Sequence, residues 1–398
     1  MRRLLPLLLL LAMGCHEDEA DEAPFETRCV DLSACLCETP PCQVDAPTIS
    51  EAIQVVPAEG LPPQIISQNA HNNLDLVLHD GRLFFVFRTA PSHFASDQTV
   101  LYVMSTTDQQ TWRYEGAFHE GTDLREPRFL SIGGRLFLFY ARLGDDPLAF
   151  EPGGARRVEY RGPDDWTPPE PVFDAGFIPW RFQHDGDRAL LIGYRGGENI
   201  YAGDDPIDVE WLQSRDGLDW QPVAPGHPVV LHGGVSETAF ALLPDGGVVA
   251  VGRNEAGDER GFGARICRAS ADALGDWTCR DEPRKFDSPV AFRQGDAVWL
   301  IGRRNVTETG AYDLGGEGTI IQRRLRNLAD YWVHPKRCAL WRVDPEALTV
   351  THVLDLPSAG DTCFASVLPL DADQWLVYDY SSPETQPDLA WMDGQNGP

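Results

Sequence analysis

Short apolar runs separated by turn residues recur along the chain. The clearest case is residues 235–253, where Pro244-Asp245-Gly246-Gly247 separates two apolar runs. Proline presets φ and glycine permits positive φ, so this segment predicts a β-hairpin. A hairpin brings its two ends together, so Glu237 and Arg253 are expected on the same face.

The unit of turn, apolar strand and arginine recurs. Further copies end at Arg88, Arg142, Arg195 and Arg303, and a sixth ends at Tyr380 without the arginine. Six hairpins at intervals of roughly 50 to 75 residues match the repeat of a propeller blade. The pattern predicts an all-β fold, a six-bladed β-propeller of four-stranded antiparallel blades. The five arginines are then expected around one mouth of the central channel.

The 398 residues are 42% hydrophobic and carry a net charge of -28. The hydrophobic content is sufficient for a large core. The acidity argues against a nucleic acid partner, because no basic stretch offsets the repulsion of phosphates. We expect a soluble monomer with an acidic surface, in which the ring of arginines is a local region of positive charge.

The N-terminus has the pattern of an export signal. Arg2-Arg3 is followed by an apolar run, residues 4–11, which is too short to span a bilayer, and then by Cys15. The pattern resembles a bacterial lipoprotein signal (residues 1–14), with Cys15 lipidated, an acidic tether over residues 15–50 and the propeller over residues 51–398. His16 then favours the outer membrane. The alternative is an ordinary secretory signal.

Nine cysteines in an exported chain suggest disulfides. Cys267 and Cys279 flank one outer hairpin and are expected to pair, and Cys338 and Cys363 remain to join the last two blades. The four in residues 29–42 fit two small disulfides better than a zinc knuckle. We expect no metal and no cofactor.

Three outer hairpins carry a Ser/Thr-x-Asp pattern followed by tryptophan, known as an Asp box. The pattern occurs at Thr106 with Trp112, at Ser214 with Trp220 and, more loosely, at Ser270 with Trp277. The aspartate caps its own turn and the tryptophan packs between blades, so these residues are structural. An insertion over residues 305–336, with a short helix near residues 320–328, is expected to shape a site rim. A short strand is expected at residues 53–57.

The Asp boxes, six blades and arginines together resemble the sialidase superfamily, and most closely uncharacterised bacterial sialidase-like proteins. The resemblance covers about residues 66–384 and rests on four segments. These are Ala70-His71-Asn72, Phe87-Arg88 with His93, Asp123-Leu124-Arg125-Glu126-Pro127 and Gly360-Asp361-Thr362-Cys363-Phe364.

The resemblance implies a site. Glu237 matches the glutamate that activates a tyrosine nucleophile, Arg253 and Arg303 match substrate-carboxylate arginines, and Asp97 lies where the acid would be. Two positions depart from the pattern. Residues 71–73 replace the first arginine, and Phe364 stands at the tyrosine position, so Tyr380 or Tyr378 is the replacement candidate.

Two functions follow, both at an arginine-rich mouth that holds an acidic sugar through forked guanidinium bonds. One is glycoside hydrolysis by paired carboxylates. The other is non-catalytic glycan binding after loss of the nucleophile. The third alternative is a pure scaffold, in which the arginines pair with carboxylates of neighbouring blades. The candidate catalytic residues are Glu237, Asp97, Asp361 and Tyr380. The candidate binding residues are Arg88, Arg125, Arg181, Arg195, Arg253, Arg303, His71, His93 and Trp180.

Overall fold

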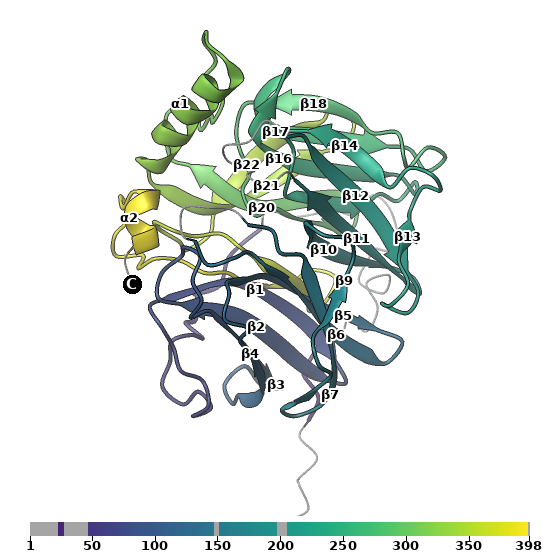
Figure 1. Cartoon of the computed structure of the whole chain (residues 1–398), viewed down its shortest axis with the longest axis vertical. Coiled ribbons are helices and arrows are strands. Elements are labelled where there is room, and N and C mark those ends of the chain that lie inside the picture. Colours follow the sequence, from purple (N-terminus) through teal and green to yellow (C-terminus); the bar gives the residue numbers. More distant parts are fainter. Residues whose placement is uncertain (1–22, 28–46, 147–150, 197–204, 397–398) are drawn as a thin grey trace, which may run out of the picture.

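The computed structural model describes residues 23–27, 47–146, 151–196 and 205–396. Within these residues the chain forms a β-propeller whose antiparallel sheets surround a common centre (Figure 1). Five sheets have the four-layer order of a blade, with each strand paired to the next one along the chain. In the second and third blades the outermost layer is divided, because β9 also pairs with β7 and β14 also pairs with β12.

The elements are β1 (Ala70–His79), β2 (Arg82–Ala90), β3 (Val100–Thr106), β4 (Arg113–Phe118), β5 (Leu124–Ile132), β6 (Arg135–Arg142), β7 (Ala155–Gly162), β8 (Asp165–Trp166), β9 (Glu170–Val172), β10 (Phe177–Asp185), β11 (Arg188–Arg195), β12 (Ile207–Ser214), β13 (Gln221–Pro222), β14 (Val229–Gly233), β15 (Thr238–Leu242), β16 (Val248–Asp258), β17 (Gly261–Ala269), β18 (Thr278–Glu282), β19 (Val290–Gln294), β20 (Ala297–Asn305), α1 (Ile320–Trp332), β21 (Lys336–Asp344), β22 (Thr349–Asp355), β23 (Ser366–Pro369), β24 (Trp375–Tyr378) and α2 (Trp391–Asn396).

The expectation of six four-stranded blades is correct for five of them. The sixth hairpin, β23 with β24, is a two-stranded sheet. After β24 the chain passes Pro383 and Pro387, which lack the N–H that a strand ladder needs, and it continues into α2 rather than a third strand. This sheet meets the first blade, where the Ser366 hydroxyl donates to Asp75 Oδ1 at 2.7 Å. The expected strand at residues 53–57 is absent, and the segment has no strand pairing and bends at residues 56–57.

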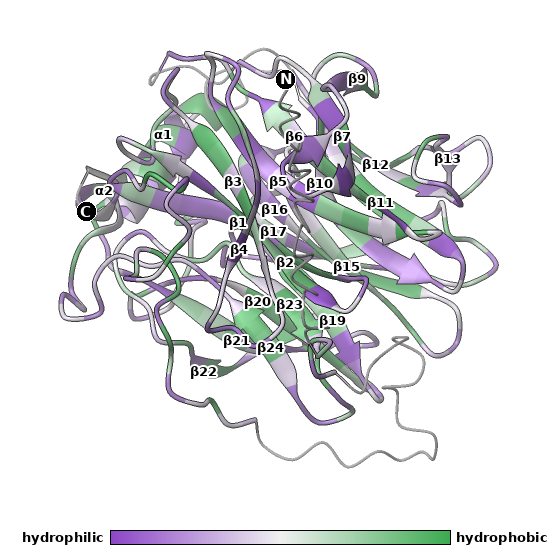
Figure 2. Ribbon diagram, turned by 90° about the horizontal axis from the view of Figure 1, so that it is seen from below, coloured by the Kyte–Doolittle hydropathy of each residue, from purple (hydrophilic) through white to green (hydrophobic). Residues whose placement is uncertain are grey.

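The hydrophobic side chains pack between adjacent blades. Figure 2 shows hydrophobic segments concentrated along strands such as β3 and β20. The largest cluster of buried side chains includes Trp180, Trp211 and Phe240, which come from the third and fourth blades. Trp112 and Trp277 of two Asp boxes pack against this cluster, as the sequence predicted. The blades are therefore held together by apolar packing, and the polar groups at their ends are available to build a site.

The Asp-box turns are also formed as expected. Asp108 Oδ1 accepts from the backbone N–H groups of Gln110 at 2.8 Å and Thr111 at 2.7 Å. Asp216 Oδ1 does the same in the third blade, accepting from Leu218 and Asp219. Such local capping explains why a three-residue pattern is sufficient to predict these turns.

The two predicted disulfides in the propeller are present. Cys267–Cys279 links β17 to β18, and Cys338–Cys363 links β21 to the segment before β23. Cys15 and the four cysteines of residues 29–42 lie outside the described residues. Among the helices of the described segments, none is both long enough and apolar enough to cross a membrane.

Candidate functional site

The five repeated arginines all lie opposite the beginning of the first strand of their blade. Register pairs join Arg88 to Asn72, Arg142 to Leu124 and Arg195 to Phe177. The backbone N–H groups of Arg253 and Arg303 donate to the carbonyls of Glu237 and Asp287. The arginines therefore share one face of the propeller, although their side chains have different surroundings.

Arg88 lies in a cluster that excludes solvent, here named the buried cluster: Asn72, Arg88, Thr99 and Asp123. Its Nη2 lies 2.7 Å from Asp123 Oδ1, its Nη1 donates to Asn72 Oδ1 at 3.0 Å, and Thr99 also donates to Asp123. Arg88 and Asp123 are each 0% exposed. All the donor nitrogens of Arg88 have protein acceptors, including the carbonyls of Ser92 and Phe94. Arg88 therefore holds the loop before β3 in place rather than facing a ligand.

Arg142 and Arg195 pair with carboxylates of their own or the preceding blade, away from the other arginines. Arg142 Nε lies 3.0 Å from Glu120 Oε2, and Arg195 Nη2 lies 3.0 Å from Glu210 Oε1. The prediction of five equivalent arginines around a ligand is therefore reduced to two, Arg253 and Arg303. Arg142 and Arg195 are not candidates because the carboxylates of Glu120 and Glu210 lie beside them.

Arg253 and Arg303 belong to a second network, here named the mouth cluster: His93, Glu237, Arg253, Asp287, Arg303, Asp361 and Tyr380. Arg253 Nη1 lies 3.0 Å from Glu237 Oε1 and 3.5 Å from Asp287 Oδ1. Asp287 also lies 3.6 Å from Arg303 Nη1. Glu255 Oε2 lies 3.3 Å from the same nitrogen of Arg253, so three carboxyl groups share it. The second arginine continues the network toward the sixth sheet.

The other half of the mouth cluster is centred on Asp361. Its Oδ2 lies 2.6 Å from His93 Nδ1, and its Oδ1 accepts from the hydroxyl of Tyr380 at 3.0 Å and from the indole of Trp391 at 3.1 Å. Arg303 Nη2 donates to the same hydroxyl at 3.3 Å. Tyr380 is therefore held between an acceptor carboxylate and a donor guanidinium.

Exposure separates the two networks. Glu237, Arg253, Arg303 and Asp361 retain 7%, 6%, 5% and 5% exposure, whereas the charged pair of the buried cluster retains none. The side chain of His93 is 18% exposed and that of Arg125, whose Nη2 donates to the carbonyl of His93, is 15% exposed. The mouth cluster is therefore slightly exposed to solvent, mainly at His93 and Arg125, whereas the charged pair of the buried cluster is not.

The carboxyl groups of the mouth cluster have divergent acidities. Burial raises the pKa of Glu237 to about 7, with Asp287 and Glu126 adding to the effect and Arg253 opposing it. Burial would also raise the pKa of Asp287, but Lys285, Arg303 and Arg253 together hold it well below its usual range. The pKa of Asp361 is likewise lowered, because His93 and Arg303 outweigh its burial. One carboxyl group is thus protonated near neutral pH beside ionised ones.

Strained backbone is concentrated at the same place. Asn73, Glu126, Ser288 and Cys363 each lie within three residues of the first residue of a blade's innermost strand, and each has positive φ, between 46° and 80°. Non-glycine residues adopt this conformation at a cost of roughly 1–3 kcal/mol, and such residues gather at binding sites. The Ser288 N–H donates to Glu237 Oε2 at 2.8 Å, so here the unusual backbone positions a candidate catalytic group.

The centre of the propeller is filled rather than open. Trp180 is fully buried, and its ring lies 5.6 Å from that of Phe364, which is also buried. The guanidinium carbon of Arg128 lies 4.4 Å from the ring of Phe364, and that of Arg181 lies 5.4 Å from it. Arg181 donates to the carbonyls of Ser288 and Pro289. Trp180 is therefore a packing residue and not the sugar platform that we expected, and Phe364 stacks on arginines.

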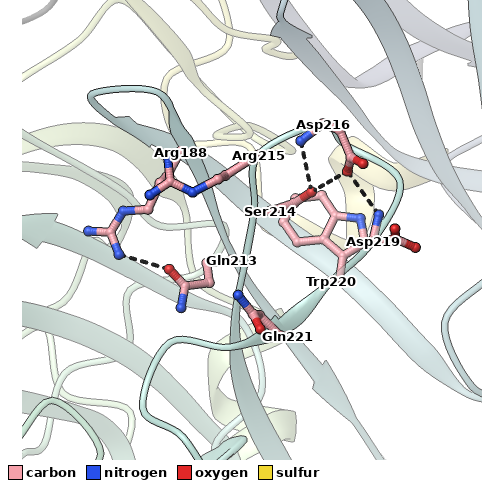
Figure 3. A pocket seen from close by; sticks show the side chains of 8 residues that line it. All are labelled: Arg188, Gln213, Ser214, Arg215, Asp216, Asp219, Trp220 and Gln221. Carbon is pink, nitrogen blue, oxygen red and sulfur yellow. Dashed lines mark hydrogen bonds between the residues drawn. The ribbon is translucent and has the colours of Figure 1, made fainter.

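Two other predicted residues lie apart from the mouth cluster. Asp97 is exposed in the turn before β3. His71 is half-buried, with its ring 6.2 Å from that of Phe87, and burial lowers its pKa. A cavity of about 550 Å³ lies beside the Asp box of the third blade, around Trp220 and Arg215 (Figure 3). That turn is at the opposite end of β12 from the end that pairs with Arg195, so this cavity is remote from the mouth cluster.

Sequence reasoning missed several residues of the site. Lys285 Nζ lies 2.6 Å from Glu255 Oε1 and 3.3 Å from Asp287, and the hydroxyl of Tyr331 donates to Asp287. Tyr331 comes from the insertion helix α1, and Trp391 comes from α2. No repeat marks these residues, although the basic residue two positions before Asp287 was a usable signal.

The class that the fold defines is an all-β propeller of antiparallel blades. No family model and no curated protein sequence matches the chain. Among solved structures, a protein of unknown function from Dyadobacter fermentans matches with a TM-score of 0.55 and 17% identity, over 80% of this chain and 93% of that one.

Two enzymes also match. A mutant of Trypanosoma rangeli sialidase with trans-sialidase activity has a TM-score of 0.51 and 12% identity, over 78% of this chain and 52% of that one. This chain therefore spans about half the length of that sialidase. An α-L-arabinanase from Penicillium chrysogenum, complexed with arabinobiose, has a TM-score of 0.46 and 12% identity, over 80% of this chain and 91% of that one. The likenesses to the Dyadobacter protein and to the sialidase mutant show the fold.

Proposed function

We propose that this chain is a sialidase-like propeller that binds and cleaves glycans carrying a carboxylate, with the mouth cluster as its site. The observation that carries the proposal is the geometry of the mouth cluster: the Tyr380 hydroxyl donates to Asp361 at 3.0 Å, and Glu237 lies 3.0 Å from Arg253. Burial raises the pKa of Glu237 to about 7, whereas His93 and Arg303 lower the pKa of Asp361. Carboxyl groups whose environments separate their pKa values are the usual acid and base of a hydrolase. The substrate carboxylate would be held by Arg125, Arg253 and Arg303.

The chemistry proceeds in two steps. Glu237 gives its proton to the oxygen of the leaving group as the glycosidic bond breaks. Tyr380 attacks the anomeric carbon and passes its proton to Asp361, which already accepts its hydrogen bond. Water then attacks the glycosyl-tyrosine, returns one proton to Glu237, and Tyr380 recovers its own from Asp361. The configuration at the anomeric carbon is retained.

A second function is favoured by the state of the tyrosines. Burial and the neighbouring Asp361 raise the pKa of Tyr380 well above its usual range, which opposes its ionisation. Glu237 accepts from the Ser288 N–H and pairs with Arg253, and neither of these contacts is to a tyrosine. A propeller that binds an acidic sugar without cleaving it fits these contacts.

The two functions separate in one experiment. The full chain is incubated with a fluorogenic sialoside, alongside Glu237→Gln and a matched control, Glu210→Gln, which changes the partner of Arg195. Hydrolysis predicts turnover that falls about 10²- to 10⁴-fold in Glu237→Gln only. Binding alone predicts no turnover but retention of acidic sugars on a glycan array, lost with Arg253→Gln. If the chain shows no turnover and also no binding, both functions are refuted.

Localisation and assembly are proposed from the sequence. We propose a monomer in which β23–β24 serves as an incomplete sixth blade, and which is anchored to the bacterial outer membrane by lipid on Cys15. Buried methylenes contribute about 0.8 kcal/mol each to such anchoring. Cys15→Ser is expected to release the chain from membranes while the propeller remains folded, and continued retention would indicate another anchor.

A further inference from the structure

The insertion helix α1 leaves several of its large apolar side chains exposed. Its buried residues are Arg324, Asn327, Leu328 and Tyr331. Along the edge of this buried side Ile321 is 40%, Leu325 60% and Trp332 37% exposed, and Val333, just beyond the helix, is 65% exposed. At 3.6 residues per turn these positions form one stripe along the helix. Surface helices of globular proteins normally have the reverse arrangement.

Specific contacts hold α1 in this orientation. The Tyr331 hydroxyl donates to Asp287, and Arg324 Nε donates to the carbonyl of Ala256 at 2.8 Å. Thr319 and Gln322 form a reciprocal capping box at its N-terminus. The helix projects from the edge of the propeller beside β20 and β21 (Figure 1). The apolar stripe is thus presented outward on a rigid and protruding element.

One exposed positive charge lies beside the stripe, although the net charge of the chain is -28. Of the three arginines of α1, Arg324 is buried and Arg323 pairs with Asp313 at 3.5 Å, whereas Arg326 is exposed. Arg326 donates to the backbone carbonyl of Gly315, so a peptide group and not a carboxylate receives that bond. An apolar face with tryptophan and leucine, flanked by arginine, is the pattern of a helix that lies in a membrane interface.

A second copy of the chain is a poorer occupant. A helix of 13 residues is about 20 Å long, so its stripe offers a few hundred Å² per partner at most. Stable protein interfaces bury about 1,200–2,000 Å² in total. A lipid surface has no such requirement. At physiological ionic strength charges are screened over about 8 Å, so the acidic body behind α1 contributes little repulsion.

We propose that α1 docks the propeller onto an anionic phospholipid surface, with Ile321, Leu325 and Trp332 inserted among the acyl chains and Arg326 beside the headgroup phosphates. The proposal does not depend on the proposed glycan chemistry. Since Tyr331 of the same helix bonds to Asp287, docking would set the mouth cluster beside the lipid surface.

The test is flotation with vesicles of phosphatidylcholine containing phosphatidylglycerol. Every protein is the full chain with Cys15→Ser, so lipid anchoring is removed and the N-terminal residues are the same throughout. Ile321→Asp with Leu325→Asp removes the stripe. The control, Leu218→Asp with Val229→Asp, changes two side chains that are each 37% exposed on other elements. Hydrogen exchange of the α1 amides is measured with and without vesicles.

The expected result is a partition coefficient at least about tenfold lower for the α1 variant than for the control, with α1 amides protected by vesicles only in the control. Equal flotation of the two variants would overturn the proposal. Equal binding to pure phosphatidylcholine would overturn the role of Arg326. A dimer in sedimentation that the α1 variant loses would show that a second copy occupies the stripe instead.

Discussion

The buried cluster and the mouth cluster are built from the same parts and have different properties. In both, an arginine at the end of a second strand pairs with an acid near the beginning of the next blade: Arg88 with Asp123, and Arg253 with Asp287. In the buried cluster every donor of Arg88 is used inside the protein. In the mouth cluster three acids share one nitrogen of Arg253, and its members retain slight solvent exposure. The repeat places both networks, and their neighbours determine which one can serve a ligand.

The largest expected effect is the loss of the buried cluster. Arg88→Ala would leave Asp123 charged and 0% exposed, with Arg125, whose Nε lies 2.5 Å from Asp123 Oδ2, as its remaining ion-pair partner. Breaking a buried pair in this way costs about 3–5 kcal/mol. The midpoint of urea unfolding should fall accordingly. A change below about 1 kcal/mol would mean that Arg125 alone compensates Asp123.

The next effect concerns the disulfide bond beside the mouth cluster. Cys338–Cys363 closes a loop with a sequence separation of 25 and fixes the chain two residues after Asp361. Replacing both cysteines by alanine should lower the free energy of unfolding by about 3 kcal/mol, chiefly by freeing the unfolded chain. The matched pair is Cys267→Ala with Cys279→Ala, far from the mouth. A smaller loss for the first pair than for the second would contradict the loop-length argument.

The acidity of Glu237 predicts a dependence of stability on pH. The folded state holds the proton up to about pH 7, while the unfolded state releases it near pH 4.5, so the contribution of this group falls as pH rises between these values. A shift of this size is worth about 3 kcal/mol. Glu237→Gln should therefore gain stability relative to the unaltered protein between pH 5 and pH 8. Parallel pH profiles of the two proteins would contradict the assignment.

The smallest effect is expected at the outer pair. Arg195 and Glu210 are partly exposed, with 30% and 14% of their side-chain surfaces accessible. Exposed pairs contribute about 0–1 kcal/mol. Arg195→Ala should therefore change neither stability by more than about 1 kcal/mol nor sugar binding. Loss of binding in this variant would indicate that Arg195 belongs to the sugar-binding site.

Local signals in the sequence predicted the parts that depend on local structure. Turn residues gave the hairpins, the Ser/Thr-x-Asp pattern gave the capped turns, and the helix near residues 320–328 appears as α1. The roles of single residues depended on other blades. Trp180 lies among side chains of distant segments, and Tyr331 reaches Asp287 across 44 residues of sequence. No periodicity indicates such contacts, so Trp180 was assigned to the site and Tyr331 was not.

The most direct test of the central claim is the titration of Glu237 itself. Carbon-13 NMR of side-chain-labelled glutamate, compared between the unaltered chain and Glu237→Gln, isolates one carboxyl signal without knowledge of the substrate. The account predicts a signal that titrates with a pKa near 7, is absent from the variant, and shifts when an acidic sugar is added. If the signal that is lost in Glu237→Gln instead titrates near pH 4 in the unaltered chain, like that of an exposed glutamate, the account of the mouth cluster as an acid–base site is contradicted.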